Sequence, residues 1–368
     1  MKFQSEFRDH ELAQSLSRQI KRAVRQPWRI MEVCGGQTHT ILQFGLEDLL
    51  PKELELLHGP GCPVCVTPVY MIEKAIAIAK ISDVIFTSYG DMLRVPAKSE
   101  DLLHARAQGA DVRIVYSPLD AVDVAKKNPD KRVVFFAVGF ETTSPANAMS
   151  VHVAAKLGLS NFFILCSHVT VPPVMMTLLE QPDNVVQAFL GPGHVCSVMG
   201  TQEYSFLSQR YKIPIVISGF EPIDILEGIL MLVLQLENGE HKLENQYSRA
   251  VLREGNLRAQ EIMAEVFDLS ERFWRGLGPI PSSGYRISDK YRAFDAEHEF
   301  PSHLENDKDE SDKCISGQIL RGIKKPPQCP AFGRECTPET PLGATMVSSE
   351  GTCANYYKFK RTEIDATN

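Results

Sequence analysis

The sequence lacks a hydrophobic run long enough to cross a membrane. Its longest apolar stretch, residues 223–236, is interrupted by Asp224, Glu227 and Gln235, whereas a spanning helix needs about 20 apolar residues. Residues 1–24 mix charges into an apolar pattern with a period of about 3.6 residues, which predicts an amphipathic helix and not a signal peptide. We therefore expect a cytoplasmic protein without a membrane partner.

Positive charge is also in short supply. The 368 residues include 39 Lys and Arg against 46 Asp and Glu, which gives a net charge of -7, and no basic run is present. Because nucleic-acid binding depends on clustered positive charge, we expect no nucleic-acid partner. The sequence also has no G-x4-G-K-[ST] motif, so nucleotide-dependent phosphoryl transfer is not expected.

The sequence does contain a regular alternation of strand-like and helix-like segments. Several short runs are apolar on both faces and are separated by stretches of helical length, which indicates parallel strands joined by crossover helices. The pattern predicts an α/β fold. The predicted strands are residues 83–89, 112–117, 132–140, 161–167, 185–190 and 213–220.

We expect two related α/β domains whose parallel sheets face a cleft, plus a smaller domain made mostly of helices and loops. Residues 1–48 form an N-terminal helix and a CGG loop that pack with the C-terminal domain. The first α/β domain is expected at residues 49–160 and the second at 161–285. Residues 286–368 form the small domain, which carries four cysteines.

Repeated glycine motifs suggest where the cleft lies. The tripeptide GPG occurs at residues 59–61, after the apolar-rich run LELLH, and at residues 191–193, after a predicted strand. The tripeptide GFE occurs at residues 139–141 and 219–221, in each case at the end of a predicted strand. Open parallel sheets bind ligands at the ends of their strands, so we expect these loops to meet at a shared cleft. Chance repetition of common glycine turns is the alternative.

Beyond the predicted strands the pattern changes three times. Residues 245–269 fit one long amphipathic helix, residues 276–285 read as a turn-rich linker, and residues 298–313 form a charged loop. The cysteine-bearing tail follows.

The tail contains Cys314, Cys329, Cys336 and Cys353 in the spacing C-x14-C-x6-C-x16-C. A segment rich in Pro and Gly buries too little apolar surface to fold without help, so a metal centre that ties the thiolates together is the simplest explanation. The spacing fits neither common structural zinc sites nor bacterial ferredoxins. Four thiolates suit a 4Fe-4S cluster or zinc, and ordinary buried thiols are the alternative.

A second cysteine motif is HGPGCPVCVTP, residues 58–68. Its Cys62 and Cys65 stand at the start of a predicted helix, where two thiols three residues apart can close a disulfide and where the helix N-terminus favours thiolate. This pair is the best redox candidate. Half of a zinc site completed elsewhere is the alternative.

A third motif, MEVCGGQTHT, follows the predicted strand WRIMEV. Cys34 stands at a glycine turn with backbone amides nearby, so its thiolate can act as a nucleophile or as a soft metal ligand. His39 could be a second ligand or a base, although a histidine beside a turn is more often a surface hydrogen-bonding group. Because Gln37 cannot titrate, proton handling in this loop falls to Cys34 or His39.

Other polar residues follow predicted strands. Asp91 is either a functional acid or a helix N-cap. His194 gains interest because its GPG loop resembles the cysteine loop, and His168 could serve in the same way. We expect Cys166 to be a core residue and leave Cys196 open.

The motifs MEVCGGQTHTI, HGPGCPVCVTP, SYGDMLRVP, AVGFETTSP, LGPGHVCSVMG and ISGFEP, together with the cysteine tail, resemble the HypD family of hydrogenase maturation factors. The resemblance runs through the whole chain. It implies a cytoplasmic scaffold on which the Fe(CN)2CO group of NiFe hydrogenases is assembled. Its implied partners are the chaperone HypC and the cyanide donor HypE, which is supplied by HypF.

The resemblance also implies roles for particular residues. Cys314, Cys329, Cys336 and Cys353 would hold a 4Fe-4S cluster in an iron-sulfur domain. Cys34 would bind the nascent iron together with a HypC thiolate, and Cys62 with Cys65 would be the redox dithiol nearby. His39, Asp91 and His194 match positions implicated around the cleft. Some members carry a second histidine where this chain has Gln37, so an imidazole role there does not carry over.

Two other functions compete with the scaffold. A free-standing thiol-disulfide oxidoreductase would use the same cluster and dithiol but would not need Cys34. A zinc-stapled binding module would have no redox role and would be colourless. We expect an assembly scaffold with a redox centre rather than a free-standing metabolic enzyme.

Overall fold

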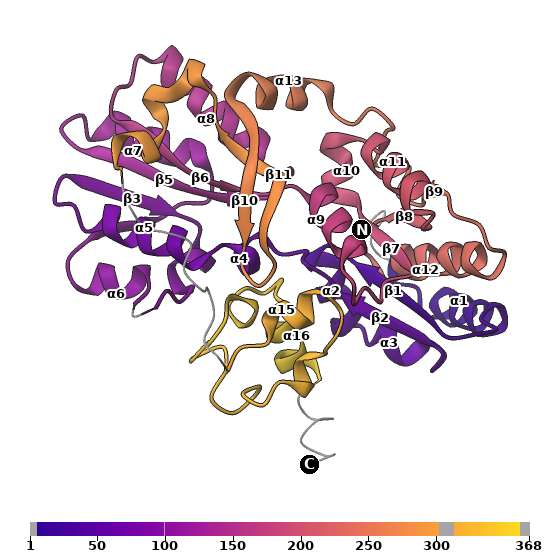
Figure 1. The fold of residues 1–368 in the computed structure, drawn as a ribbon. Coiled ribbons are helices and arrows are strands. Elements are labelled where there is room, and N and C mark those ends of the chain that lie inside the picture. Colours follow the sequence, from indigo (N-terminus) through magenta and orange to yellow (C-terminus); the bar gives the residue numbers. More distant parts are fainter. Residues whose placement is uncertain (1–5, 99, 302–312, 361–368) are drawn as a thin grey trace.

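The computed structural model describes residues 6–98, 100–301 and 313–360. Two α/β halves lie side by side, with a β-hairpin between them and the C-terminal tail below (Figure 1). The predicted fold class is therefore confirmed. Most of the predicted charged loop at residues 298–313 lies outside the described residues.

One half is built on a five-stranded parallel sheet, here called sheet A, with the strand order β2-β1-β7-β8-β9. Strands β7 and β8 in this sheet are buried along their length, which explains why their sequences are apolar on both faces. The strands are β1 (Trp28–Glu32), β2 (Leu54–His58), β7 (Ala188–Pro192), β8 (Ile215–Ser218) and β9 (Leu243–Asn245).

Helices cover both faces of sheet A. One face packs against α1 and α12, which also contact each other, and the other packs against α9, α10 and α11. Helix α1 bears out the amphipathic helix predicted near the N-terminus. The bounds are α1 (His10–Ala23), α12 (Pro222–Glu237), α9 (Val171–Glu180), α10 (Gly193–Met199) and α11 (Gln202–Tyr211).

The other half is built on a four-stranded parallel sheet, sheet B, in the order β4-β3-β5-β6. Helices α5 and α6 pack on one face, and α7, α8 and α13 on the other. The bounds are β3 (Val84–Ser88), β4 (Asp111–Ile114), β5 (Arg132–Gly139), β6 (Phe162–His168), α5 (Val69–Ala79), α6 (Leu102–Ala107), α7 (Pro118–Lys127), α8 (Ser144–Lys156) and α13 (Leu257–Val266).

The sheets do not coincide with the segments expected as domains. Sheet A combines strands from residues 28–58 and 188–245, and sheet B takes β6 from beyond the expected boundary at residue 160. The physical reason is that β1 pairs with both β2 and β7, so the chain leaves sheet A, builds sheet B and returns. Each α/β half is therefore discontinuous in sequence.

Two expectations for residues 245–285 were wrong. The predicted long helix is only α13, because the left-handed Gly255 packs its backbone against residue 200 and Asn256 then caps a new helix. The predicted linker is the second strand of an antiparallel hairpin between the two halves. Its strands are β10 (Phe267–Trp274) and β11 (Gly278–Ile287).

The remaining helices are short and surround the strand ends and the tail. Helix α2 packs against α16, so the CGG loop does contact the C-terminal tail. The bounds are α2 (Gly35–Gln43), α3 (Leu46–Leu49), α4 (Pro63–Val66), α14 (Ala296–Glu299), α15 (Ser316–Leu320), α16 (Thr352–Phe359) and the 3-10 helices η1 (Glu6–Arg8), η2 (Gly90–Arg94), η3 (Asp289–Phe294), η4 (Pro326–Gln328) and η5 (Ala344–Met346).

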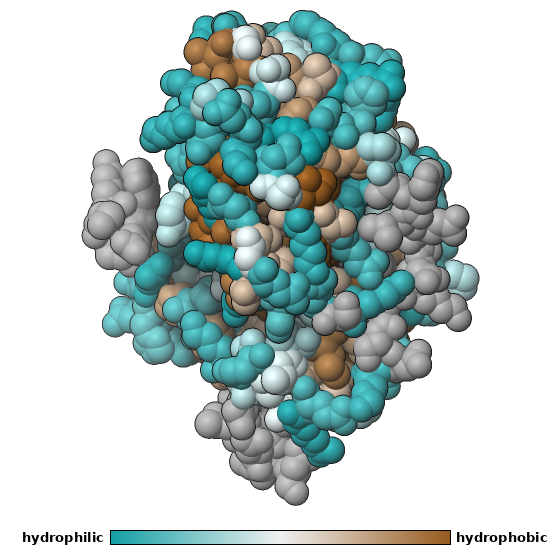
Figure 2. Space-filling view, turned by 90° about the vertical axis from the view of Figure 1, so that its left-hand side faces the viewer, coloured by the Kyte–Doolittle hydropathy of each residue, from teal (hydrophilic) through white to brown (hydrophobic). Residues whose placement is uncertain are grey.

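In the view of Figure 2, apolar residues lie in several small groups among hydrophilic ones. Among the described residues, no helix has both the length and the apolar character that a bilayer crossing requires.

Candidate functional site

A cavity of about 620 Å³ lies where strand ends of both sheets meet, and it is called the Cys34 cleft. Both GPG loops reach it through Gly61 and Pro192, and the first GFE motif reaches it through Gly139 and Phe140. The predicted shared cleft is thus confirmed for these three loops. The two GPG loops are not equivalent parts of two domains, however, because both follow strands of sheet A.

Cys34 lies at the junction between β1 and α2, where it is the N-cap residue, and its side chain is half-buried. Its loop packs tightly on the first GPG loop: the Gly35 amide donates to the Gly61 carbonyl at 2.8 Å. A Cβ atom on Gly61 would lie 2.3 Å from the Cys34 nitrogen, so only glycine permits this approach. Burial, with the charges of Glu350 and Glu32, raises the pKa of the Cys34 thiol to about 12.

Beneath Cys34 lies a buried polar network centred on Glu32, which is 2% exposed. The Glu32 carboxylate accepts a hydrogen bond from the Cys34 amide at 2.8 Å and another from the Thr38 hydroxyl. It also pairs with Nδ1 of His58 at 2.8 Å. Because two of these three contacts come from the Cys34 amide and the nearby Thr38 hydroxyl, this carboxylate fixes the position of Cys34.

The network continues from His58 to Glu47, whose carboxylate lies 3.7 Å from Nε2 of His58. Burial alone would lower the pKa of His58, but the hydrogen bond to Glu32 and the charge of Glu47 outweigh it and raise that pKa to about 9. Burial alone would raise the pKa of Glu47, but the interactions with His58 and Lys325 outweigh it and lower that pKa to about 2. The strand end below the cleft therefore holds a charged histidine between two carboxylates.

Gln37 is a structural residue and not a titrating one. Its side chain is fully buried, and its amide nitrogen donates to the carbonyls of Gly191, Ser218 and Gly219 at 3.1–3.3 Å. It thereby joins α2 to the ends of β7 and β8. The departure from the family pattern at this position thus serves the packing of the strand ends.

Two of the three further candidates line the Cys34 cleft. Asp91 lies in η2, whose N-cap is Tyr89, so the expected alternative of Asp91 as an N-cap is wrong. His194 lines the cleft and stacks on Phe220 of the second GFE motif, with the ring centroids 3.6 Å apart. Partial desolvation lowers the pKa of His194.

His39 does not belong to the cleft lining. Its Nδ1 lies 2.8 Å from the Asn355 side-chain oxygen, and its ring meets Phe359 edge to face. Both partners are on α16. The structure therefore places His39 at the contact between the CGG helix and the tail.

Cys62 and Cys65 form a disulfide with a Cα–Cα distance of 5.2 Å. The two residues are 3% and 2% exposed, and Pro63 and Val64 between them line the Cys34 cleft. The disulfide therefore lies behind the cleft wall, directly after the glycine that touches Cys34. The structure pairs these thiols with each other, as the sequence predicts, and not with distant zinc ligands.

The four tail cysteines line one small cavity, together with apolar residues of the tail. Among the described residues, no three His, Cys, Asp or Glu side chains are close enough to hold a single metal ion. What the structure shows is thus a shared apolar pocket faced by four sulfurs. The cysteines in its wall are Cys314, Cys329, Cys336 and Cys353.

The residues around these sulfurs suit bound thiolates. The Leu342 amide donates to the Cys336 sulfur at 3.4 Å, and the Thr345 hydroxyl donates to the Cys353 sulfur at 3.2 Å. A Cβ on Gly343 would lie 2.6 Å from the Cys314 sulfur. Burial raises the pKa of Cys353, so its thiolate needs a cationic centre. Donor chemistry and hydrogen bonds therefore fit a cluster bound by four cysteines.

The three thiol sites are connected through short elements. Helix α4, which contains Cys65 and begins directly after Cys62, packs against η5 of the tail, and Thr345 of η5 is the donor to Cys353. The tail also supplies Glu350 to the Cys34 cleft, where a Cβ on Gly35 would lie 2.5 Å from that of Glu350. The disulfide thus lies between the Cys34 loop and the cysteine pocket.

The other candidates are core residues. Cys166 is buried in sheet B, where its thiol donates to the Tyr285 carbonyl, as expected. His168 is also buried, and its pKa is lowered to about 3 by burial and the Arg272 charge. Cys196, left open from the sequence, is fully buried in the core behind sheet A.

Sequence reasoning missed three residues of the site: Glu32, His58 and Glu350. Glu32 and His58 each end a strand whose other inward residues are apolar, and such a charged residue is a usable sign of a buried ion pair. No comparable signal marks Glu350, because its place at the cleft depends on how the tail docks.

Comparison with known proteins agrees with this geometry. The chain matches the HypD family model, described as "Hydrogenase formation hypA family", over residues 11–360. It is 48% identical to hydrogenase maturation factor HypD2 of Bradyrhizobium diazoefficiens, over 98% of this chain and 97% of that protein. It is 47% identical to hydrogenase maturation factor HypD of Escherichia coli K12 over the full length of both. With its cysteine motifs placed around one cleft and one pocket, the chain belongs to the HypD family.

Proposed function

We propose that this protein acts in hydrogenase maturation as the scaffold on which the Fe(CN)2CO group of NiFe hydrogenases is assembled. The observation that carries the proposal is the position of Cys34, a thiol at the edge of a cavity formed by the strand ends of both sheets. A soft sulfur ligand suits a low-spin iron, which is the cargo here. The relatives named as maturation factors support the same role.

The cleft supplies the rest of a holding site. Glu32 fixes the Cys34 loop from below, and Asp91, His194 and Tyr116 stand around the cavity. These groups can donate hydrogen bonds to iron-bound ligands or accept hydrogen bonds from them. The open side of the cleft leaves room for a second thiolate, contributed by the partner HypC, and for delivery of cyanide by HypE, which HypF supplies.

Redox support comes from the two other thiol sites. The Cys62–Cys65 disulfide takes up two electrons and two protons when it opens to two thiols, and it lies behind the cleft wall. The four tail cysteines would hold a 4Fe-4S cluster, which delivers electrons one at a time when bound. Packing of α4 on η5 provides the short route between them.

The burial of the disulfide argues against a free-standing thiol-disulfide oxidoreductase. Such an enzyme must present an attacking sulfur to its substrate, whereas Cys62 and Cys65 are 3% and 2% exposed. We place the protein in the reducing cytoplasm, where a disulfide of this kind is a functional redox group rather than a staple.

Infrared spectroscopy of the protein, purified anaerobically with its HypC partner, tests the proposal. We expect bands of iron-bound cyanide and CO in the wild type. The control variant Cys166→Ala, which removes a buried thiol far from the cleft, should show the same bands. The Cys34→Ala variant should lose these bands but keep the visible absorption of its cluster. Bands that survive in Cys34→Ala would refute the scaffold, and a colourless wild type would favour a zinc-stapled module.

A further inference from the structure

A second cavity, of about 800 Å³, shares no lining residue with the Cys34 cleft. It is called the Glu141 pocket. It lies between the two halves, is open on one side, and is lined by residues of α9, α11, α13 and the β10–β11 hairpin. Its volume is in the range of pockets that hold small organic molecules. The function proposed above makes no use of it.

At one wall of this pocket lies a buried carboxylate with an unused oxygen. Glu141 is 1% exposed, and its Oε1 accepts a hydrogen bond from the Val171 amide at 2.9 Å. Its Oε2 has no hydrogen-bond partner in the described part of the chain, and neither has the hydroxyl of Thr170, which also lines the pocket. Buried polar atoms without partners are costly, so a ligand atom that reaches either of them would gain a hydrogen bond that the protein leaves unmade.

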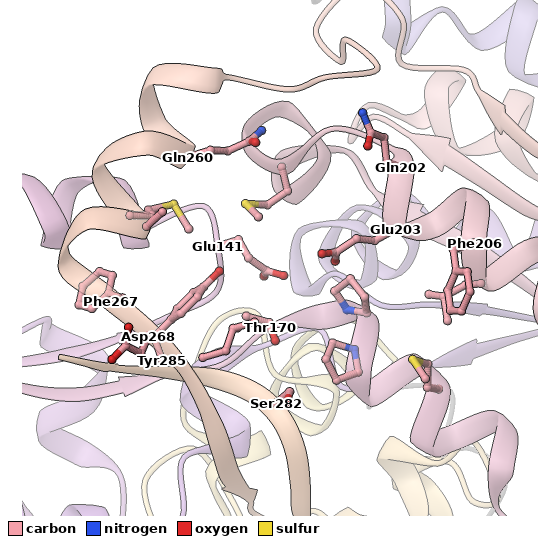
Figure 3. A pocket seen from close by; sticks show the side chains of 18 residues that line it. Glu141, Thr170, Gln202, Glu203, Phe206, Gln260, Phe267, Asp268, Ser282 and Tyr285 are labelled. Carbon is pink, nitrogen blue, oxygen red and sulfur yellow. The ribbon is translucent and has the colours of Figure 1, made fainter. Parts of the chain in front are cut away.

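The charge of the lining decides the kind of ligand. Three carboxylates line the pocket, and no Lys, Arg or His side chain is among its lining residues. Figure 3 shows Glu141 and Glu203 turning their carboxylates toward one another across the cavity, with the hydroxyl end of Tyr285 nearby. Burial, with the charge of Glu203, raises the pKa of Glu141 to about 8, as expected for an acid that lacks a cationic partner.

The remaining wall is apolar and adaptable. Met176, Met199 and Met263 line it together with Phe206 and Phe267. Methionine side chains fit irregular apolar bodies, and aromatic faces attract cations. An occupant should therefore combine a positive head with an apolar stem.

We propose that the Glu141 pocket binds a small organic cation, with an ammonium or guanidinium group at Glu141 and Glu203 and an apolar stem against the methionines. The Thr170 hydroxyl completes the polar end. The alternative is that Glu141 only caps α9 through Val171, a role that uses one of its two oxygens. That role predicts no ligand.

Calorimetric titration of the full-length protein with a panel of cations tests this. The panel is butylammonium, hexylammonium, 2-phenylethylammonium, benzamidinium and agmatine, with neutral 2-phenylethanol and anionic 3-phenylpropanoate as isosteres. At least one cation should bind one per chain, and Glu141→Gln should weaken it by about tenfold, the usual size of a lost charge-assisted hydrogen bond. The neutral isostere should bind about tenfold more weakly than its cation, and the anion more weakly still.

Glu261→Gln is the matched control, because it removes the same charge from the exposed side of α13 without lining the pocket. It should leave the affinity unchanged. If Glu141→Gln does not fold, Glu203→Gln on α11 should show the same loss. The proposal is overturned if no cation in the panel binds in a manner that depends on these carboxylates. It is overturned as well if a lysine-containing peptide binds there more tightly than every free cation, because a partner side chain would then be the occupant.

Discussion

The Cys34 cleft and the cysteine tail, residues 313–360, both present thiols, but the fold supports them differently. Cys34 is fixed by parallel strands, by the Gly61 contact and by the Glu32 network, all of which consist of contacts between protein groups. The tail has only short helices around a pocket faced by four sulfurs. The comparison teaches that the thiol proposed to hold iron is preorganised by the fold, whereas we propose that the tail relies on the cluster that its thiolates would bind.

The largest expected effect separates these two regions. Cys353→Ser removes one of the four proposed cluster ligands, and a segment organised by a metal can draw on the order of 10 kcal/mol from that metal. We expect loss of the cluster absorption and rapid proteolytic cleavage within residues 313–360. Cys34→Ala should change the free energy of unfolding by less than about 1 kcal/mol, since it cuts a half-buried side chain. Limited proteolysis with mass spectrometry checks both, and equal protection in the two variants would contradict the comparison.

A second change should break the preorganised site without touching a thiol. Glu32→Ala removes the nearer of the two carboxylates beside the buried, charged His58 and leaves only Glu47 at 3.7 Å; breaking a buried ion pair typically costs about 3–5 kcal/mol. Glu55→Ala on the neighbouring strand removes an exposed ion pair and should cost less than about 1 kcal/mol. Urea unfolding measures the difference. Similar costs for the two variants would show that the network does not hold the Cys34 loop.

The sequence predicted the strands and the cleft more reliably than the domains. Runs such as residues 132–140 are apolar on both faces because helices cover both faces of each sheet. The apolar composition of such a run is therefore enough to predict a buried strand. The loops at residues 59–61 and 191–193 reach the cleft because strand ends of a parallel sheet share an edge. The local sequence pattern is therefore enough to predict the strands and the position of the cleft.

Strand order and side-chain partners were beyond the sequence. Nothing local shows that β7 returns to pair with β1 after sheet B is complete, so the discontinuous halves could not be predicted. Residues 276–285 carry turn-forming glycine and proline yet form β11, because pairing with β10 overrides propensity. His39 was predicted to serve the cleft but contacts α16, a contact that depends on how the tail docks.

The pH dependence of stability sharpens the comparison further. His58 has its pKa raised from 6.5 to about 9, so its stabilising contribution is complete below pH 6.5 and is lost as the pH rises through 9. Glu47, with its pKa lowered from 4.5 to about 2, contributes above pH 4.5 and loses its contribution toward pH 2. The His58 contribution is on the order of 3 kcal/mol. In thermal unfolding, the midpoint temperature of the wild type should decline between pH 6.5 and 9, and the decline should be less steep in His58→Gln. Identical pH dependence in the two proteins would disprove the charged state of His58.

The smallest expected effect concerns the close approach of the two loops. Gly61→Ala places a Cβ 2.3 Å from the Cys34 nitrogen, and such overpacking costs about 1–3 kcal/mol. Gly90→Ala in the same cleft is the control, since its Cβ meets nothing nearer than 3.9 Å. Because the Cys34 loop must shift in Gly61→Ala, we expect weaker infrared bands of iron-bound ligands as well as a lower unfolding midpoint. Gly61→Ala could instead lose stability but keep the full intensity of these infrared bands. That result would show that iron binding does not depend on the exact position of Cys34. The preorganisation of the Cys34 loop would then serve the stability of the fold and not the binding of iron.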